Sequence, residues 1–352
     1  MQRQPLEIQT LYAELLEQLS ILEARRSIGH LSGSFTTKTV KGVRYYYFQH
    51  SEPGGKKRQL YIGRKDNVLD RVVARYRRER ERLAEDTVAI ERLCTLLRAG
   101  GIIKTDTASA RVLQALSDSG LFHLGGVLVG THAFVLIGNL LGVSWAGASL
   151  RTQEIDIAAE STVSITLPRL KGGIPGNLEG LEMGFLPVPQ LDPKKPSTSF
   201  KVRGKGLRVD LLTPLRGQRA TGPVTIPRLE AAAQPLPFLD FLIENPVRGA
   251  VVNGGGVLVS VPEPARFAFH KLILAGERDT ATHSKREKDL RQATQVLSFL
   301  LEERPGDLRI TWDDIRARGR GWVKRVNAGI VSMKKLDPST GDKLGAHLEG
   351  VG

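Results

Sequence analysis

Two acidic residues stand two positions apart in a short apolar segment, Arg151-Thr-Gln-Glu-Ile-Asp-Ile-Ala158. In a strand, alternate side chains point to the same face, so Glu154 and Asp156 share one face while the isoleucines occupy the other. Two neighbouring carboxylates repel each other unless a cation lies between them. Mg²⁺ is commonly held by one or two carboxylates together with substrate phosphates. The segment fits a metal site and, equally well, a half-buried strand with a solvated acidic face.

A third acid lies in a later apolar segment, Leu207-Arg-Val-Asp-Leu-Leu-Thr-Pro214. Taken alone, Asp210 reads as a residue on the exposed face of an edge strand. Beside the acidic pair, it becomes a candidate third ligand for the same metal site.

A strand-to-helix turn precedes both segments, in Leu128-Val-Gly-Thr-His-Ala-Phe134. The pattern predicts a strand over 127–129 and a helix over about 132–141. Backbone N–H groups at the start of a helix attract phosphate, and a small residue such as Gly130 lets a ligand approach closely. Glycine also serves packing at many such turns, so this signal is weak by itself.

The three segments together resemble the nucleotidyltransferase superfamily of DNA polymerase beta. GTHAF, RTQEIDIA and RVDLLTP look more closely like an uncharacterised group of bacterial nucleotidyltransferase-fold proteins. The later segments ARFAFHKLILAGER and KREKDLRQA are similar to that group as well, so the likeness covers about residues 100–305.

This resemblance implies an α/β (α+β) fold with a nucleotidyltransferase-type mixed sheet and flanking helices. It implies transfer of a nucleoside monophosphate from a nucleoside triphosphate to a hydroxyl of RNA, protein or a small molecule. The implied ligands of Mg²⁺ (or Mn²⁺) are Glu154, Asp156 and Asp210. The residues implied to lie near the triphosphate are Gly130, Thr131, Arg151 and Lys271. The alternative is an inactive relative that binds nucleic acid or takes part in a toxin–antitoxin-type interaction.

The region Ser34–Lys65 carries half of the net charge of the protein, which is +14. β-Branched and aromatic runs separated by glycine-containing turns predict a three-stranded antiparallel meander there. Its eight basic residues, against Glu52 alone, are Lys38, Lys41, Arg44, Lys56, Lys57, Arg58, Arg64 and Lys65. Its interleaved aromatic residues are Tyr45, Tyr46, Tyr47, Phe48 and Tyr61. The meander fits a nucleic-acid-binding surface and, equally, a small sheet that buries alternate aromatics.

The 352 residues suffice for more than one domain. We expect a helix–meander–helix module over 1–100, the catalytic domain over 101–262, and a helical region with a basic tail over 263–352. The lone Cys94 fits a reducing compartment, and no signal peptide is visible, so a cytoplasmic location is expected.

Several element boundaries follow from the sequence pattern. Helices are predicted over about 5–28, 68–97, 107–119, 264–277 and 283–302. Further strands are predicted over 207–212 and 257–261, beside the strand over 154–158. The Gly- and Pro-rich stretch 168–196 predicts a long surface excursion, and the last 15 or so residues are expected to fray. The stretch 119–150 has no charged residue, but its glycines favour a strand and a core helix over a membrane span.

Overall fold

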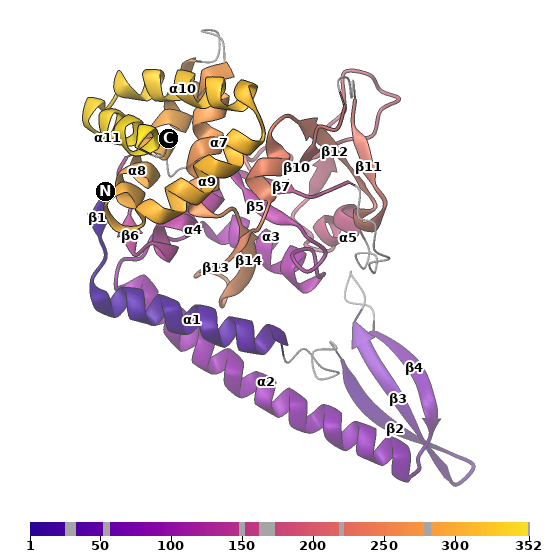
Figure 1. Ribbon diagram of the computed structural model, residues 1–352. Helices are drawn as coiled ribbons and strands as arrows, with labels where there is room; N and C mark the ends of the chain where they lie inside the picture. The colour runs from indigo at the N-terminus through magenta and orange to yellow at the C-terminus, as the bar shows by residue number, and fades with distance from the viewer. Residues whose placement is uncertain are drawn as a thin grey trace.

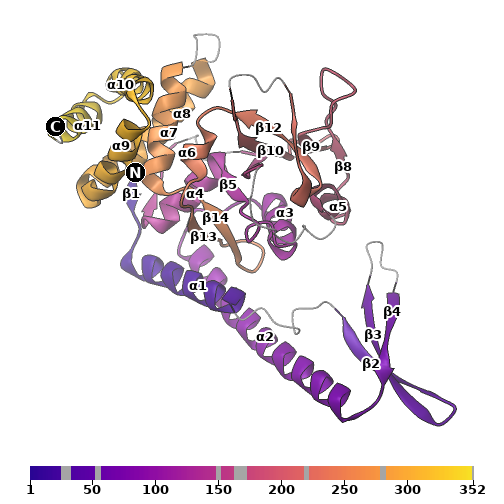
Figure 2. The same cartoon turned by 45° about the vertical axis from the view of Figure 1, so that its right-hand side comes forward.

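A computed structural model of the chain describes residues 1–24, 33–51, 57–147, 152–161, 173–217, 222–277 and 283–350. A body of mixed helices and strands forms the upper part of Figure 1, and two long helices lie beneath it. A separate three-stranded sheet stands beside the far end of the longer helix, as both Figure 1 and Figure 2 show. The architecture is therefore a body and a small sheet joined by a long helix.

The N-terminal elements are β1 (Gln2–Arg3), α1 (Leu6–Ala24), β2 (Ser34–Val40), β3 (Val43–Ser51), β4 (Lys57–Arg64) and α2 (Asn67–Ala99). The first elements of the body are α3 (Thr107–Asp118), β5 (Val127–Val129), α4 (Gly130–Leu140), β6 (Val143–Ser144), β7 (Glu154–Ala158), α5 (Gly173–Glu179) and β8 (Phe185–Pro187).

The body continues with β9 (Ser199–Val202), β10 (Arg208–Pro214), β11 (Val224–Ile226), the 3₁₀ helix η3 (Pro227–Leu229), β12 (Ala231–Leu236), α6 (Leu239–Ile243), β13 (Val247–Val251) and β14 (Val257–Val261). The last helices are α7 (Pro264–Glu277), α8 (His283–Glu303), α9 (Pro305–Ala317), α10 (Arg320–Lys334) and α11 (Pro338–Glu349).

The main sheet of the described residues is mixed and has seven strands. Its order is β11-β12-β10-β7-β5, with β9 also paired to β10 and β8 paired to β9. Strand β10 runs parallel to β7 and β12, whereas β5 and β11 run antiparallel to their neighbours. This pattern, with helices α3 to α7 around it, confirms the predicted mixed α/β fold.

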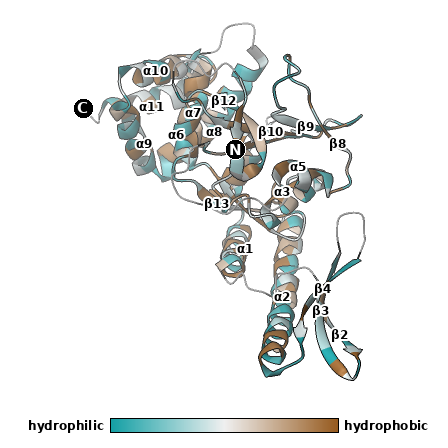
Figure 3. Ribbon diagram, turned by 90° about the vertical axis from the view of Figure 1, so that its right-hand side faces the viewer, coloured by the Kyte–Doolittle hydropathy of each residue, from teal (hydrophilic) through white to brown (hydrophobic). Residues whose placement is uncertain are grey.

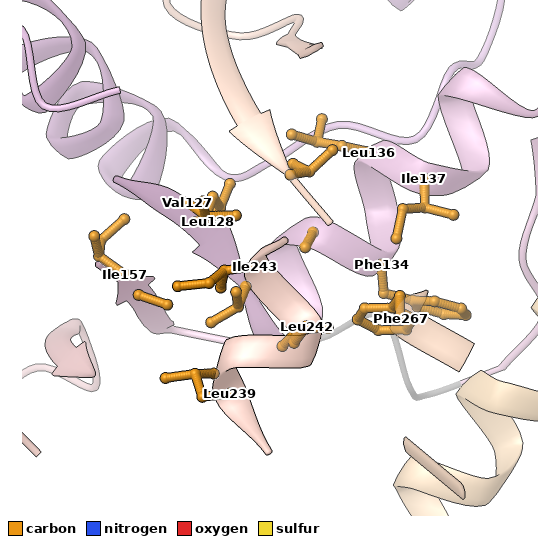
Figure 4. Close-up of a cluster of buried hydrophobic side chains, with 14 of the residues drawn as sticks. Val127, Leu128, Phe134, Leu136, Ile137, Ile157, Leu239, Leu242, Ile243 and Phe267 are labelled. Carbon is orange, nitrogen blue, oxygen red and sulfur yellow. The ribbon is translucent and has the colours of Figure 1, made fainter. Parts of the chain in front are cut away.

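The core of the body lies where this sheet meets helices α4, α6 and α7 (Figure 4). Leu128 of β5 and Ile157 of β7 turn toward Phe134, Leu242 and Phe267 of the helices, and all five are nearly or completely buried. Each such side chain contributes about 1.5–3 kcal/mol when it leaves water. The strands that carry the candidate acids are thus anchored by their apolar faces.

Helices α1 and α2 pack against each other and against the hairpin β13–β14. Apolar residues of α1 recur at helical spacing, and Ile8, Tyr12, Leu15 and Leu19 are buried. The hydroxyl of Tyr12 donates a hydrogen bond to the carbonyl of Ala250 at 3.0 Å and accepts one from its N–H. The predicted helix over 5–28 is therefore confirmed as far as Ala24, and the residues after it lie outside the described ranges.

The uncharged stretch 119–150 folds as predicted where it is described. Strand β5 and helix α4 occupy its centre, and both are buried in the body. No helix within the described ranges combines the length and the apolar composition that a bilayer span requires.

One expectation from the sequence is confirmed only in part. The stretch 168–196, where described, holds strand β8 and begins with helix α5, whose Ile174 and Leu178 enter the core. No residue over 179–196 is buried, so this later part is the predicted surface excursion. A second expectation, a frayed C-terminus, is wrong. The C-terminal tail is helical rather than frayed up to Glu349. Asp337 caps α11 by accepting the N–H of Thr340 at 3.0 Å, and Leu344 and Leu348 are buried. An aspartate followed by proline is an N-cap signal that composition alone does not reveal.

Candidate active site

The acidic segments form neighbouring parallel strands in the body. In the register of β7 and β10, Asp156 lies opposite Asp210 and Glu154 lies opposite Arg208. Ile155 and Val209, which alternate with the acids, are completely buried. The period-two placement predicted from the sequence therefore holds, and Glu154, Asp156 and Asp210 lie on one face of the sheet with Arg208.

Strand β5 brings the Gly-Thr turn against the first acidic strand. It pairs antiparallel with β7 so that Val129 lies opposite Asp156, and the chain then turns directly into α4. Gly130 has a φ of +70°, and a Cβ added there would lie 2.2 Å from Oδ2 of Asp156. Only glycine fits this close approach, because any other side chain would both clash and strain the backbone.

The start of α4 places backbone N–H groups that have no partner within the helix beside Asp156. Its first turn is Gly130, Thr131 and His132, and no side chain caps it. The first N–H groups of a helix have no partner within the helix, and they carry the positive end of its dipole. The turn can therefore contact an anion that reaches the acidic face.

The pKa of Asp156 is raised by its burial and by the neighbouring acids. Burial, together with the nearby carboxylates of Asp210 and Glu154, raises the pKa of Asp156 to about 6, while Lys271 and Lys288 act in the opposite direction. Like charges held together in a poorly solvated site favour the protonated form of one of them. A cation placed among the three acids would relieve this repulsion.

Asp210 already has a cationic partner within the protein. Its Oδ1 accepts a hydrogen bond from Nε of Arg208 at 2.7 Å and a second one from the hydroxyl of Ser199. Nη2 of Arg208 also donates to Ser199 at 2.9 Å. Arg208 and Ser199 thus fix the Asp210 carboxylate by one oxygen only.

Glu154, Asp156 and Asp210 are the residues that could hold a metal ion at this site. Among the described residues, no three His, Cys, Asp or Glu side chains converge closely enough to hold a metal ion. The backbone register nevertheless places three carboxylates on one face, and carboxylate oxygens are the donors that Mg²⁺ prefers. The residue types and strand positions fit a divalent cation, and Arg208 and Ser199 hold Oδ1 of Asp210 rather than its Oδ2.

Two lysines lie on the helical side of the acids. Lys271 of α7 donates to Asp289 at 2.6 Å, and both side chains are nearly buried. Lys288 of α8 forms no salt bridge with any residue that the structure describes. Burial lowers the pKa of Lys288 and Lys271 lowers it further, whereas Glu154 and Asp156 act to raise it. Lys288 is therefore an unpaired cation within electrostatic range of the acidic face.

Three residues of the site, Lys288, Arg208 and Ser199, were not predicted from the sequence. Arg208 stands two positions before Asp210, so strand alternation alone could have placed it on the acidic face. The segment KREKDLRQA contains Lys288, but nothing in its pattern distinguishes Lys288 from Lys285 and Arg286. Arg151, the remaining predicted phosphate contact, lies outside the described residues.

His132 contributes no charge to the site near neutral pH. Its side chain is buried, and burial lowers its pKa to about 4, although Asp106 acts to raise it. The neutral imidazole therefore packs within the first turn of α4.

Among solved structures, the chain resembles an antigenic nucleotidyltransferase-like protein from Paracoccidioides brasiliensis. The two share 12% sequence identity at a TM-score of 0.36, and the match covers 69% of this chain and 95% of that one. A search of curated proteins finds no match to this chain.

A protein-family model described as Nucleotidyltransferase matches residues 107–317, from the first residue of α3 to the last residue of α9. The matched region contains both acidic strands, the Gly130 turn and Lys288, and it excludes β2, β3 and β4. Because the match covers more than half of the 352 residues, the chain belongs to the nucleotidyltransferase family.

Proposed function

We propose that the protein is a Mg²⁺-dependent nucleotidyltransferase that transfers a nucleoside monophosphate from a nucleoside triphosphate to a hydroxyl group. The hydroxyl oxygen bonds to the α-phosphorus, the bond between the α- and β-phosphates breaks, and pyrophosphate leaves. The observation that carries this proposal is the approach of Gly130 to Asp156, opposite Asp210 on the parallel strand β10. It brings backbone donors for phosphate and carboxylates for a metal to one place, in a chain that belongs to the family.

The residues take distinct roles in this proposal. Glu154, Asp156 and Asp210 hold Mg²⁺ (or Mn²⁺) through carboxylate oxygens. The ion, when bound, neutralises the triphosphate and favours the deprotonated form of the attacking hydroxyl. The first turn of α4 at Gly130 and Thr131 contacts the phosphates by its N–H groups.

Lysine charge completes the site. Lys288, which is unpaired among the described residues, is the proposed contact for the outer phosphates. Lys271 already forms a salt bridge with Asp289. Its proposed role is therefore to add positive potential near the phosphates rather than to contact a phosphate directly. Arg151 stays a proposed phosphate contact.

The acceptor is proposed to be the hydroxyl of an RNA, a protein or a small molecule, and the basic sheet favours nucleic acid among these. A cytoplasmic location accords with Cys94, the only cysteine of the sequence and a free, buried thiol. The division of the chain at residues 100 and 262 stays a prediction.

The test is transfer of label from each α-labelled nucleoside triphosphate to total cellular RNA and protein in the presence of Mg²⁺. Asp156→Asn should abolish transfer, because it removes a charged metal ligand while keeping the shape of the side chain. The matched control is Asp313→Asn, which neutralises an acid whose side chain is 57% exposed in α9 and should leave transfer unchanged.

One specific observation supports a second candidate function. Arg208 supplies an internal cation to Asp210 at 2.7 Å, which is also what a member of the family that has lost its metal would show. Such a protein would bind nucleic acid without turnover. Absence of transfer with every nucleotide, together with tight nucleic-acid binding, would favour this candidate over the enzyme.

A further inference from the structure

The sheet formed by β2, β3 and β4 has one face that is packed against α2. Phe35 and Phe48 contact the ring of Tyr76 at centroid distances of 5.1 and 5.9 Å. Tyr46 is buried, and its hydroxyl donates a hydrogen bond to Asp70 at 2.6 Å. The aromatic residues of this face are thus explained by packing.

The opposite face holds a second set of aromatic residues, which none of the described helices covers. By strand register Tyr45, Tyr47 and Tyr61 share this face, and the ring of Tyr61 lies 6.0 Å from that of Tyr45 and 5.7 Å from that of Tyr47. Tyr61 is 60% exposed. We call the surface that carries Tyr45, Tyr47 and Tyr61 the open face.

Cations and side-chain amides surround these tyrosines. Register places Lys38 opposite Tyr45, Arg64 on the other side of Tyr45, and Lys57 at the far end of β4. Nζ of Lys38 lies 5.0 Å from the centroid of the Tyr47 ring. Gln49 and Gln59 pair across the strands on the same face, with a hydrogen bond of 3.2 Å.

The described part of this sheet, residues 34–51 and 57–64, contains no Asp or Glu. Lys38, Lys57 and Arg64 form no salt bridge with any of the residues that the structure describes. An unopposed set of cations around exposed aromatic rings is complementary to a polyanion that carries flat apolar groups.

Helix α2 holds this sheet away from the body. Between Tyr76 and Ile90, which are buried, no described side chain of α2 is buried, so about 20 Å of helix is solvated. Figures 1 and 2 show the sheet beside the N-terminal end of α2, and Figure 3 shows that the exposed stretch is mainly hydrophilic. The open face is therefore accessible to a large ligand.

We propose that the open face binds single-stranded nucleic acid. Unpaired bases stack on the exposed tyrosine rings, and the backbone phosphates contact Lys38, Lys57 and Arg64. A duplex would satisfy the cations but could not offer its base faces to Tyr61, because they are stacked inside the helix. Binding by the open face does not require the proposed transferase activity. The proposal rests on the proposed function only for the further step in which the bound strand is the acceptor of the transfer.

The test is binding of the full-length protein to a fluorescently labelled 20-nucleotide single strand, as RNA and as DNA, with the matching duplex DNA for comparison. Tyr61→Ala should weaken single-strand binding at least about tenfold, since loss of one stacked base has about that effect. Leu60→Ala is the matched control: it truncates an adjacent side chain, 50% exposed, that points to the packed face. It should leave the affinity unchanged.

Salt dependence gives a second measurement. Removing one phosphate-binding cation should reduce the slope of log K against log [salt] by about 0.7 for a single strand. The triple variant Lys38→Gln, Lys57→Gln, Arg64→Gln should therefore flatten the slope by about 2, while Arg78→Gln on the exposed part of α2 should not. Circular dichroism of each variant checks that the sheet remains folded.

The outcomes separate this inference from the proposed function. Single-strand binding that is weakened in Tyr61→Ala and unchanged in Asp156→Asn supports the open face, even if no nucleotide is ever transferred. Equal affinity for the duplex, or no effect of Tyr61→Ala, would overturn it even if transfer is observed. Absence of any nucleic-acid binding would also overturn it.

Discussion

Strand β7 of the body and strand β3 of the small sheet both alternate two kinds of side chain, but they use the alternation differently. In β7, Ile155 and Ile157 are buried, and the strand pairs with β5 and β10, so that its acids lie beside residues from distant parts of the chain. In β3, aromatic residues occupy both faces, and α2 covers only one of them. Because the apolar face of β7 is buried in the body, the residues of the acidic site are held in place by several packed elements. The open face of the small sheet is not packed against the body in the part of the chain that the structure describes.

Gly130→Ala is expected to have the largest effect on the acidic site. The new methyl group would lie 2.2 Å from Oδ2 of Asp156 in a backbone with φ +70°. We expect nucleotidyl transfer to fall about 100-fold or more, because the acid and the start of α4 must separate. Transfer assays with labelled nucleoside triphosphate measure the loss.

Gly42→Ala is the matched control in the small sheet. Gly42 has a φ of +79°, and its added Cβ would meet nothing within 4 Å. It therefore carries only the conformational cost, about 1 kcal/mol, and transfer should be unaffected. Equal loss of transfer in the two variants would show that the contact with Asp156 is irrelevant.

Side chains are packed more tightly beneath the acidic face of the body than in the small sheet. Ile157→Ala removes a completely buried side chain from the core and should lower the free energy of unfolding by about 2–5 kcal/mol. Ile62→Ala truncates a side chain that is 40% exposed in β4 and should cost less than about 1 kcal/mol. Urea denaturation measures both. Similar costs would mean that the small sheet is as tightly packed as the body.

The third and smallest effect is a pH dependence confined to the acidic face. Burial, with Asp210 and Glu154, raises the pKa of Asp156 to about 6 in the folded protein, against about 4 when unfolded. The folded state thus binds a proton more readily, and the free energy of unfolding falls as the pH rises from about 4 to 6. Above this interval the full cost of the charged carboxylate remains.

Asp156→Asn stays neutral and should therefore be more stable than the metal-free parent protein at pH 8, by about 3 kcal/mol, because each pKa unit corresponds to about 1.4 kcal/mol. The difference should shrink toward zero near pH 4, where the parent carboxyl is protonated. Thermal unfolding in the presence of a chelator measures it at the two pH values. A difference that does not change with pH would contradict the charge crowding.

The sequence predicted best where short-range periodicity carries the information. Alternation in β7 and β10, the strand–helix turn at Gly130 and the meander over 34–65 were visible because each depends on neighbouring residues. Helix α5 was missed because its few apolar residues gain stability only from the body around them. Helices α9 to α11 were not delimited individually, because their charged composition hides buried stripes such as Val326, Ile330 and Met333 of α10.

The residue types of the candidate site, its three acids, its turn and its surplus of basic residues were determined by the sequence alone. The tertiary structure decided which of them meet. Pairing of β7 with β10 and β5 places Asp210 and Gly130 beside Asp156, and packing of α8 brings in Lys288, which no local pattern distinguished. It also decided which tyrosines of the meander remain exposed. Local periodicity fixes the face on which a side chain lies, but burial of apolar surface between distant segments selects what that face meets.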